Sequence, residues 1–196
     1  MKPSILPFKC YNFDMSSDAF YKKELFICQV DKDDKIIGPV ERWKAHRENI
    51  LHRAISVVVY YEDKVFVQHR KHPLFDGYFD ITIASHQFFE NGKAQDDISS
   101  VYQNLLREWN VTRNDLKKDP EFIGKIYYMS PDWDTEFHEQ EFDYFYKVDL
   151  KDMKLPIMDY CYGFSLLPLD EIKKGKHGIL PHVTPWTKKA IEDGVL

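Results

Sequence analysis

The stretch RAISVVVYYEDKVFVQHR, residues 53–70, places the strongest limit on what this chain can fold into. It opens with a run of β-branched and aromatic residues, has the polar pair Glu62 and Asp63 at its centre, and then continues with alternating apolar residues. Alternation around a short polar turn is typical of a β-hairpin. A β-sheet is therefore part of the predicted fold.

The remaining segments predict strands and helices in mixed order. From Ala94 to Trp109 the apolar residues fall at helical spacing, and acidic residues occupy the first turn, where they favour the helix dipole. Short helices are expected to begin near Pro168 and Thr184. Strands are expected at about 24–30, 36–40, 81–89, 121–129, 136–148 and 158–166. This order predicts an α+β fold with a mixed β-sheet flanked by helices.

Composition limits the class of protein. With 196 residues and 43% hydrophobic content, the chain can form one domain with a sizeable core. A formal charge of -5 offers no broad basic surface for nucleic acid or an anionic membrane. The first residues, MKPSILPFKCYNF, lack the apolar run of a signal peptide, and no segment approaches the ~18 apolar residues that cross a bilayer. The three cysteines are widely spaced. We therefore expect a cytoplasmic protein without nucleic-acid or membrane partners.

The segment EFHEQEFDYFY, residues 136–146, places three carboxylates on one face of a predicted strand. The two-residue period of a strand puts Glu139, Glu141 and Asp143 on one side and aromatic residues on the other. Two interpretations remain open. The acidic face is either solvated above an aromatic core, or it is one half of a metal site to which histidines contribute. The available histidines are His46, His52 and His86.

His86, in the strand-like stretch ITIASHQFF, has the same two interpretations. Taken alone, a histidine there is a hydrogen-bonded core residue, a strand-end surface residue or a ligand. Five motifs bear on the choice: KAHRENILHRAISVVVY, the strand with ASH, the helix with Glu108, EQE and TPW. In this order they resemble type I isopentenyl diphosphate isomerases, which are members of the Nudix superfamily. The similarity runs from about Leu25 to Trp186.

The resemblance implies a fold and a metal site. The fold is a single Nudix domain over residues 1–196, with an N-terminal extension at about 1–22 and a Nudix-type mixed β-sheet sandwiched between helices. A second ion, Mg²⁺, is implied near the helix residue Glu108. For the first ion, a mixed nitrogen and oxygen ligand set suits Mg²⁺, Mn²⁺ or Zn²⁺. Its implied ligands are His46, His52, His86, Glu139 and Glu141.

The resemblance also implies a small-molecule diphosphate as the substrate. Arg42 and Arg70 match positions that bind the diphosphate, which suits the bidentate contacts of guanidinium groups with phosphate. Glu141 and Tyr128 are implied as catalytic residues. Tyr128 and Trp186 match aromatic residues that line the prenyl pocket. A solvated surface charge remains the alternative for Arg42, as core packing does for Trp186.

The chain departs from the isomerase pattern at Ala84. The isomerases have a cysteine two residues before the histidine that matches His86, and it acts as an acid or base opposite the glutamate that matches Glu141. The methyl group of Ala84 cannot carry a proton. Ser85 is expected to point to the other face of the strand. The loop after Arg70 and residue Asn104 also depart from the family's further basic positions.

Three functions follow from this pattern. The first is a metal-dependent Nudix protein of the isopentenyl diphosphate isomerase type, acting as a monomer or homodimer on a prenyl or related organic diphosphate, with Ala84 altering the isomerisation. The second is a Nudix diphosphate hydrolase, although only Glu108 remains of the helix acids that gather Mg²⁺ in those enzymes. The third is a non-catalytic protein that binds metal and diphosphate, which Ala84 favours.

Overall fold

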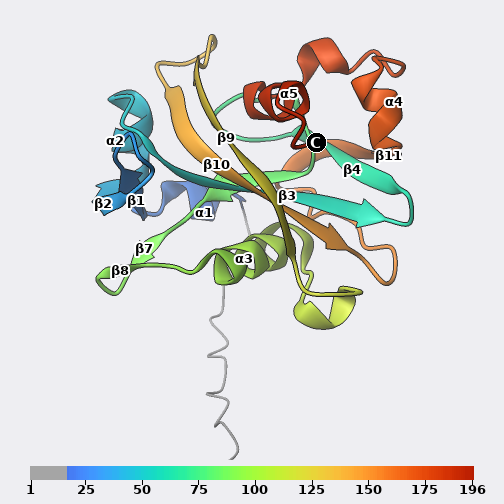
Figure 1. Ribbon diagram of the computed structural model, residues 1–196, viewed down its shortest axis with the longest axis horizontal. Coiled ribbons are helices and arrows are strands. Elements are labelled where there is room, and N and C mark those ends of the chain that lie inside the picture. The colour runs from blue at the N-terminus through green and yellow to red at the C-terminus, as the bar shows by residue number, and fades with distance from the viewer. Residues whose placement is uncertain (1–16) are drawn as a thin grey trace, which may run out of the picture.

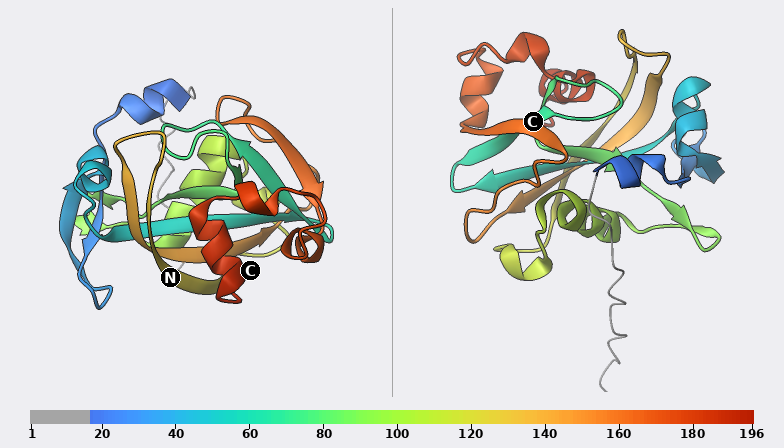
Figure 2. Two further views of the ribbon diagram at one scale, coloured as in Figure 1. Left: turned by 90° about the horizontal axis from the view of Figure 1, so that it is seen from above. Right: turned by 180° about the vertical axis from the view of Figure 1, so that it is seen from behind.

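The computed structural model of the protein describes residues 17–196 (Figure 1). Most of the expected N-terminal extension, including the MKPSILPFKCYNF stretch and Cys10, lies outside the described residues. The expected α+β class is confirmed. A large mixed sheet occupies the middle of the molecule, and helices cover both of its faces (Figure 2).

Within residues 17–196, nine strands form the main sheet. They are β1 (Phe26–Val30), β2 (Ile36–Glu41), β3 (His52–Tyr61), β4 (Lys64–Arg70), β5 (Phe79–Asp80), β6 (Ile83–His86), β9 (Glu121–Pro131), β10 (His138–Asp149) and β11 (Cys161–Leu167). Strand β3 pairs in parallel with β10 and antiparallel with β1, β4 and β6. A separate two-stranded sheet consists of β7 (Phe89–Glu90) and β8 (Lys93–Ala94).

The predicted hairpin of β3 and β4 is present, but its strands pair only next to the turn. Tyr60 pairs with Val65 and Tyr61 with Lys64, after which the strands part. Strand β4 then pairs with β11, and β3 pairs with β6 on one side and β10 on the other. Because of this parting, the first half of β3 lies between two strands that carry candidate ligands.

The helices are α1 (Ser17–Lys22), α2 (Arg42–Arg47), α3 (Asp97–Trp109), α4 (Leu169–Lys173) and α5 (Pro185–Glu192), with 3-10 turns at Arg113–Asp115 and Leu180–His182. Helix α3 begins three residues later than the apolar spacing predicts. Ala94 lies in β8, and the side chain of Asp96 caps the helix by accepting a hydrogen bond from Ser99 N at 2.9 Å. The polar segment after β2 forms α2, which the sequence did not predict.

Two hydrophobic cores lie on opposite faces of the sheet. On one face, α3 contributes Val101, Leu105 and Trp109, and the Trp109 ring meets the Phe66 ring edge-on with centroids 4.5 Å apart. On the other face, α4 contributes Ile172 and α5 contributes Trp186. The sheet is therefore sandwiched between helices, as Figure 1 shows with α3 on one side and α4 and α5 on the other.

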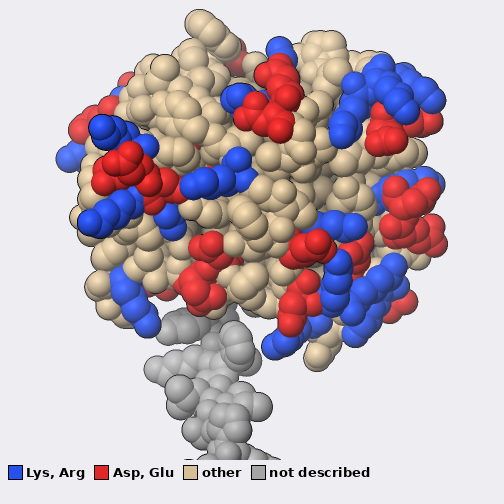
Figure 3. All heavy atoms as spheres, in the orientation of Figure 1, with Lys and Arg blue, Asp and Glu red and all other residues tan. Residues whose placement is uncertain are grey.

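The described surface carries charges of both signs. Basic and acidic side chains are interspersed on the face drawn in Figure 3. Among residues 17–196, no helix is long and apolar enough to cross a membrane. Cys28 and Cys161, the two cysteines in the described part of the chain, are buried free thiols.

Candidate metal centre

The acidic face of β10 points into the protein. Glu139 is 6% exposed, Glu141 4% and Asp143 1%, whereas Phe142 and Tyr144 on the opposite face are partly exposed. The interpretation as a solvated acidic face is therefore wrong. Buried carboxylates at this spacing need protons, hydrogen-bond donors or a cation to offset their mutual repulsion.

Strand register brings two histidines to this face. Across the parallel pair of β3 and β10, His52 lies opposite Glu141, and Ala54 lies opposite Asp143. Across the antiparallel pair of β3 and β6, Ala54 lies opposite His86. Residues opposite one another in neighbouring strands share a face, so His52 and His86 point to the same side as the carboxylates.

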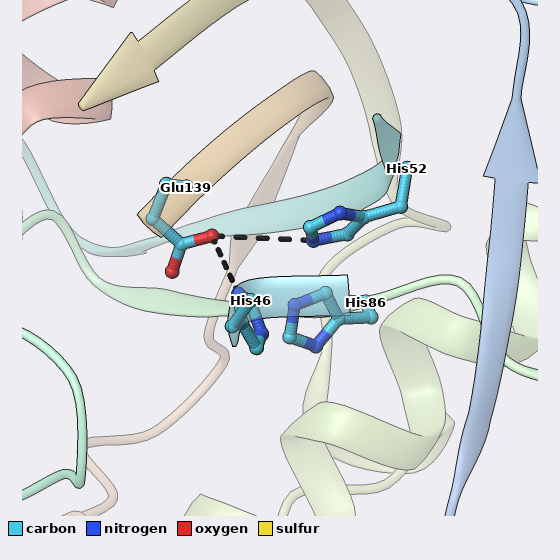
Figure 4. Close-up of side chains that lie close together, drawn as sticks. All are labelled: His46, His52, His86 and Glu139. Atoms are coloured by element: carbon cyan, nitrogen blue, oxygen red, sulfur yellow. Dashed lines mark ion pairs between the residues drawn. The ribbon is translucent and has the colours of Figure 1, made fainter. Parts of the chain in front are cut away.

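The third histidine, His46, comes from α2. Glu41 begins this helix, because its carboxylate accepts hydrogen bonds from Trp43 N at 2.9 Å and Lys44 N at 2.7 Å. The helix turns His46 inward, where its side chain is buried. Figure 4 shows His46, His52 and His86 gathered around Glu139.

The ligand atoms lie close together. His52 Nε2 is 2.9 Å and His86 Nε2 is 3.3 Å from Glu141 Oε1, and His46 Nδ1 is 3.2 Å from Glu139 Oε2. The three imidazole centroids are 5.0–5.2 Å apart. One ligand atom from each of four residues, His46, His52, His86 and Glu139, lies within 4.8 Å of the others. The five predicted ligands therefore converge, and the ion itself stays a prediction.

The donor set fits a divalent metal. His52 Nδ1 lies 2.7 Å from Ile50 O, and only a protonated nitrogen can make that hydrogen bond, so Nε2 is the ring nitrogen that faces the carboxylates. His52 Nε2 and Glu139 Oε2 lie 3.9 Å apart, and neither has a hydrogen bond of good geometry with the described residues. A shared cation would satisfy both buried atoms.

Burial and neighbouring charges set the protonation of the cluster. Burial lowers the pKa of His46, and it lowers the pKa of His86 to about 3, so both rings are neutral at pH 7. Burial and the Glu141 charge raise the pKa of Glu139 well above its usual value. Although burial opposes it, His52 and His86 hold the pKa of Glu141 well below its usual range. Neutral imidazoles are the form that binds metals.

Tyr128 and Trp186 lie beside the cluster. The Tyr128 hydroxyl donates a short hydrogen bond to Glu141 Oε2, and burial together with Glu141 raises the pKa of Tyr128 well above its usual value. The Tyr128 and Trp186 rings are 5.9 Å apart. Trp186 Nε1 donates to Asp80 Oδ1 at 3.0 Å, so the indole also has a structural role.

The predicted diphosphate arginines have protein partners. Arg42 Nη2 donates to the carbonyls of Phe20 and Tyr21 at 3.2 and 3.0 Å. Arg70 Nη1 donates to Asp80 Oδ2 at 2.8 Å. Arg42 lines the cavity that adjoins His46 and His86. A role of either arginine in binding diphosphate stays a prediction.

Glu108, the predicted second metal position, lines the same cavity from α3. Its Oε1 accepts a hydrogen bond from Arg107 Nη2 at 2.6 Å, and burial raises its pKa. Ala84 and Ser85 both line this cavity, and Ser85 Oγ accepts a hydrogen bond from Arg107 at 3.2 Å. Ala84 thus lies where a cysteine would face the cavity.

Sequence reasoning missed three residues of this region, and it placed a fourth, Asp143, on the acidic face without naming it as a site residue. Asp143 accepts a hydrogen bond from Ser56 Oγ at 2.7 Å beneath the cluster, and its position on the acidic face could have indicated it. Tyr21 and His72 line the cavity, and no sequence motif marks them. Asp80, which binds Arg70 and α5, lies in a two-residue strand without a recognisable pattern.

Comparisons with known proteins place this arrangement in a fold class. The sequence matches no protein-family model and no curated protein. DR0079 of Deinococcus radiodurans superposes with a TM-score of 0.56 at 14% identity, over 78% of this chain and 89% of its own. A MutT protein of Methanosarcina mazei gives 0.56 at 9% identity, over 73% and 91%. A MutT Nudix hydrolase of Burkholderia pseudomallei gives 0.52 at 11% identity, over 72% and 96%.

These similarities show that the chain has the Nudix fold. At such low sequence identities they show a shared arrangement of strands and helices, but they do not show that the residues of a site are shared. The chemistry must therefore be argued from the side chains that this chain itself presents.

Proposed function

We propose that the protein is a divalent-metal-dependent enzyme that acts on a small organic diphosphate. One observation carries this proposal: three imidazoles and two carboxylates from separate segments converge on one buried point. Burying five such groups together is costly unless they serve a bound ion. His46, His52, His86, Glu139 and Glu141 would hold the ion.

The donor set does not choose one metal. Mg²⁺ is the usual partner of a diphosphate, and nitrogen ligands favour Mn²⁺ or Zn²⁺ at the histidine site. Glu108 would serve a second Mg²⁺ on the cavity side. When bound, such ions supply positive charge that offsets phosphate and lower the pKa of a bound water.

Hydrolysis of the diphosphate is the first candidate reaction. Two of the proteins that share the fold are MutT proteins, one of them a Nudix hydrolase. Glu141, held ionised by His52 and His86, can accept a proton from an attacking water. The methyl group of Ala84 offers no proton on the cavity side for the two-sided transfer that moves a double bond.

Isomerisation of the isopentenyl type is the second candidate. The hydrogen bond between Tyr128 and Glu141 beside the Trp186 ring favours it, since it combines a proton-bearing pair with an aromatic surface. A diphosphate-binding protein without catalysis is the third outcome of the same test.

Incubation of the metal-loaded protein with isopentenyl diphosphate in deuterated water, followed by proton and phosphorus NMR, separates these reactions. Release of phosphate supports hydrolysis, whereas deuterium in dimethylallyl diphosphate supports isomerisation. Saturable binding without either product overturns the catalytic proposal. Absence of both metal binding and diphosphate binding overturns the whole proposal.

A further inference from the structure

The cavity next to the metal cluster is too small for a diphosphate. It encloses about 20 Å³ and is lined by His46, His86, Ala84, Glu108, Tyr21 and Trp43, among others. That is room for about one water molecule. A groove of about 390 Å³ lies beside it, with Pro73 and Phe137 in its walls. Tyr21 and Trp43 line both spaces and therefore separate them.

Tyr21 of α1 forms part of the cavity wall, beside Arg42, Arg107 and Glu108. Its ring meets the His72 ring edge-on with centroids 4.7 Å apart and lies 6.4 Å from the Trp43 ring. Burial, and then the Glu108 charge, raise the pKa of its hydroxyl, while Arg107 and Arg70 act in the opposite direction. The neutral phenol thus lies among the groups that would surround a diphosphate and its Mg²⁺.

Two arginines that face the cavity are used to hold α1. Arg42 Nη2 donates to the carbonyls of Phe20, Tyr21 and Lys23 at 3.2, 3.0 and 3.4 Å. The Arg107 guanidinium lies 4.2 Å from the centroid of the Phe20 ring. A helix of six residues has little stability of its own, so these contacts hold it in place.

Trp43 is the less mobile of the two separating residues. It belongs to α2, which also carries His46 and is capped by Glu41. Its Nε1 donates to Tyr21 O at 3.0 Å, so it is a support on which α1 rests. If a ligand is to enter, Tyr21 is the side chain that must leave.

We propose that α1 and the diphosphate compete for one place: Tyr21 occupies the diphosphate position, and ligand binding displaces α1 and frees Arg42 for phosphate. This inference rests on the proposed function, because it assumes a diphosphate ligand. Departure of Tyr21 joins the cavity to the groove, which then has room for the organic group beside Trp43 and Phe137. Tyr21 therefore limits the affinity and the size of the ligand.

The test is the affinity of inorganic pyrophosphate for the Mg²⁺-loaded protein, measured by calorimetry. Tyr21→Ala should bind pyrophosphate about tenfold more tightly than the wild type. In the wild type, only the molecules in which Tyr21 has left the cavity can bind, whereas the variant has no ring to block the site. Tyr21→Phe keeps the ring and should bind within about twofold of the wild type. Tyr127→Ala, which removes an exposed ring on the outer face of β9, is the matched control.

Hydrogen exchange of residues 17–24 gives an independent readout. Addition of pyrophosphate to the wild type should increase hydrogen exchange in this segment, since α1 loses its contacts with Arg42 and Trp43. Decreased exchange, or weaker binding by Tyr21→Ala, would mean that α1 closes over the ligand and overturns the competition. Equal affinities of all variants overturn it as well. If neither the wild type nor Tyr21→Ala binds pyrophosphate while metal still binds, the proposed function fails, and the competition fails with it.

Discussion

At the scale of single residues, Ala84 is where the chain departs from the isomerase pattern that its sequence motifs predict. It lines the cavity beside His86, as does its neighbour Ser85, whose hydroxyl accepts a hydrogen bond from Arg107. The site therefore keeps the hydrogen-bonded carboxylate of Glu141 and hydroxyl of Tyr128, and has a methyl group at position 84. Replacing Ala84 with cysteine adds one heavy atom, a sulfur that can carry a proton, and so tests this difference directly.

Ala84→Cys should raise the isomerisation of isopentenyl diphosphate by about 10²–10⁴-fold, because it supplies a second acid or base opposite Glu141. Product formation in deuterated water measures the gain. Ala84→Val is the matched control, since it enlarges the same side chain without a group that can carry a proton and should produce no gain. Combining Ala84→Cys with Glu141→Gln should abolish the gain. An Ala84→Cys protein that binds metal and diphosphate without isomerisation would exclude this chemistry for the pocket.

His72 is held as a neutral imidazole. Its Nδ1 lies 3.0 Å from Leu74 N and 3.2 Å from Leu74 O, so the backbone of the following loop holds the ring in place. Burial, followed by the charges of Arg70 and Arg42, keeps the pKa of His72 well below its usual value. In the unfolded chain the same group titrates near pH 6.5, so acidification adds a proton to the unfolded state first.

Stability should therefore fall as the pH drops below the unfolded pKa, and His72→Asn should remove part of this fall. Asparagine keeps an acceptor for Leu74 N but does not titrate. Relative to this variant, the wild type should lose about 1 kcal/mol of unfolding free energy between pH 7 and pH 5. Urea denaturation at the two pH values measures the difference. Parallel pH profiles of the two proteins would contradict this account of His72.

At the scale of elements, one carboxylate joins α5 to the sheet. Asp80 Oδ1 accepts hydrogen bonds from Trp186 Nε1 at 3.0 Å and from Thr187 Oγ1 at 3.0 Å. Asp80 Oδ2 accepts one from Arg70 Nη1 at 2.8 Å. Asp80 and Arg70 are both buried, so this ion pair is poorly screened by solvent. The position of Trp186 next to Tyr128 depends on this network.

Asp80→Asn should lower the free energy of unfolding by about 3 kcal/mol, because it leaves the Arg70 charge buried without an ionised partner. Asp119→Asn is the control. It breaks an exposed pair with Arg113 and should cost less than about 1 kcal/mol. Urea denaturation measures both. Metal affinity should be unchanged in Asp80→Asn, and a joint loss of metal binding and stability would show that the network also builds the metal site.

At the scale of the whole molecule, the metal cluster connects segments far apart in the chain. Its residues come from α2, β3, β6 and β10, and the carboxylates lie in the protein interior without enough hydrogen-bond donors. A cation that binds the folded state alone would therefore stabilise the entire fold.

Addition of Mn²⁺ at about 100 times its dissociation constant should stabilise the protein by about 2.7 kcal/mol. For a chain of this length, the melting temperature should rise by about 5–10 °C. Scanning calorimetry with and without chelator measures the shift. Glu139→Gln should lose most of the shift, whereas Glu136→Gln, an exposed neighbour, should retain it. An equal shift in both variants would show that the ion binds elsewhere.

The sequence by itself determined most strands of the main sheet, helix α3 and which residues of β10 share a face. Alternation predicts the strands around residues 53–70, and helical spacing predicts α3. The two-residue period puts Glu139, Glu141 and Asp143 on one side of β10. A role of His46, His52 and His86 as metal ligands was predicted only from the resemblance of short motifs to a known family. These are local properties, set by backbone geometry within a few residues.

Only the tertiary structure decided which face of β10 is buried and what the arginines contact. Both outcomes depend on pairing between distant segments, such as Glu141 opposite His52, which no local period encodes. The packing of Tyr21 against His72 and the lowered pKa of His72 depend on contacts between helices and loops that are distant in sequence. Charge, burial and partner choice are properties of the assembled surroundings, so the function of this site rests on contacts that form only when the chain is folded.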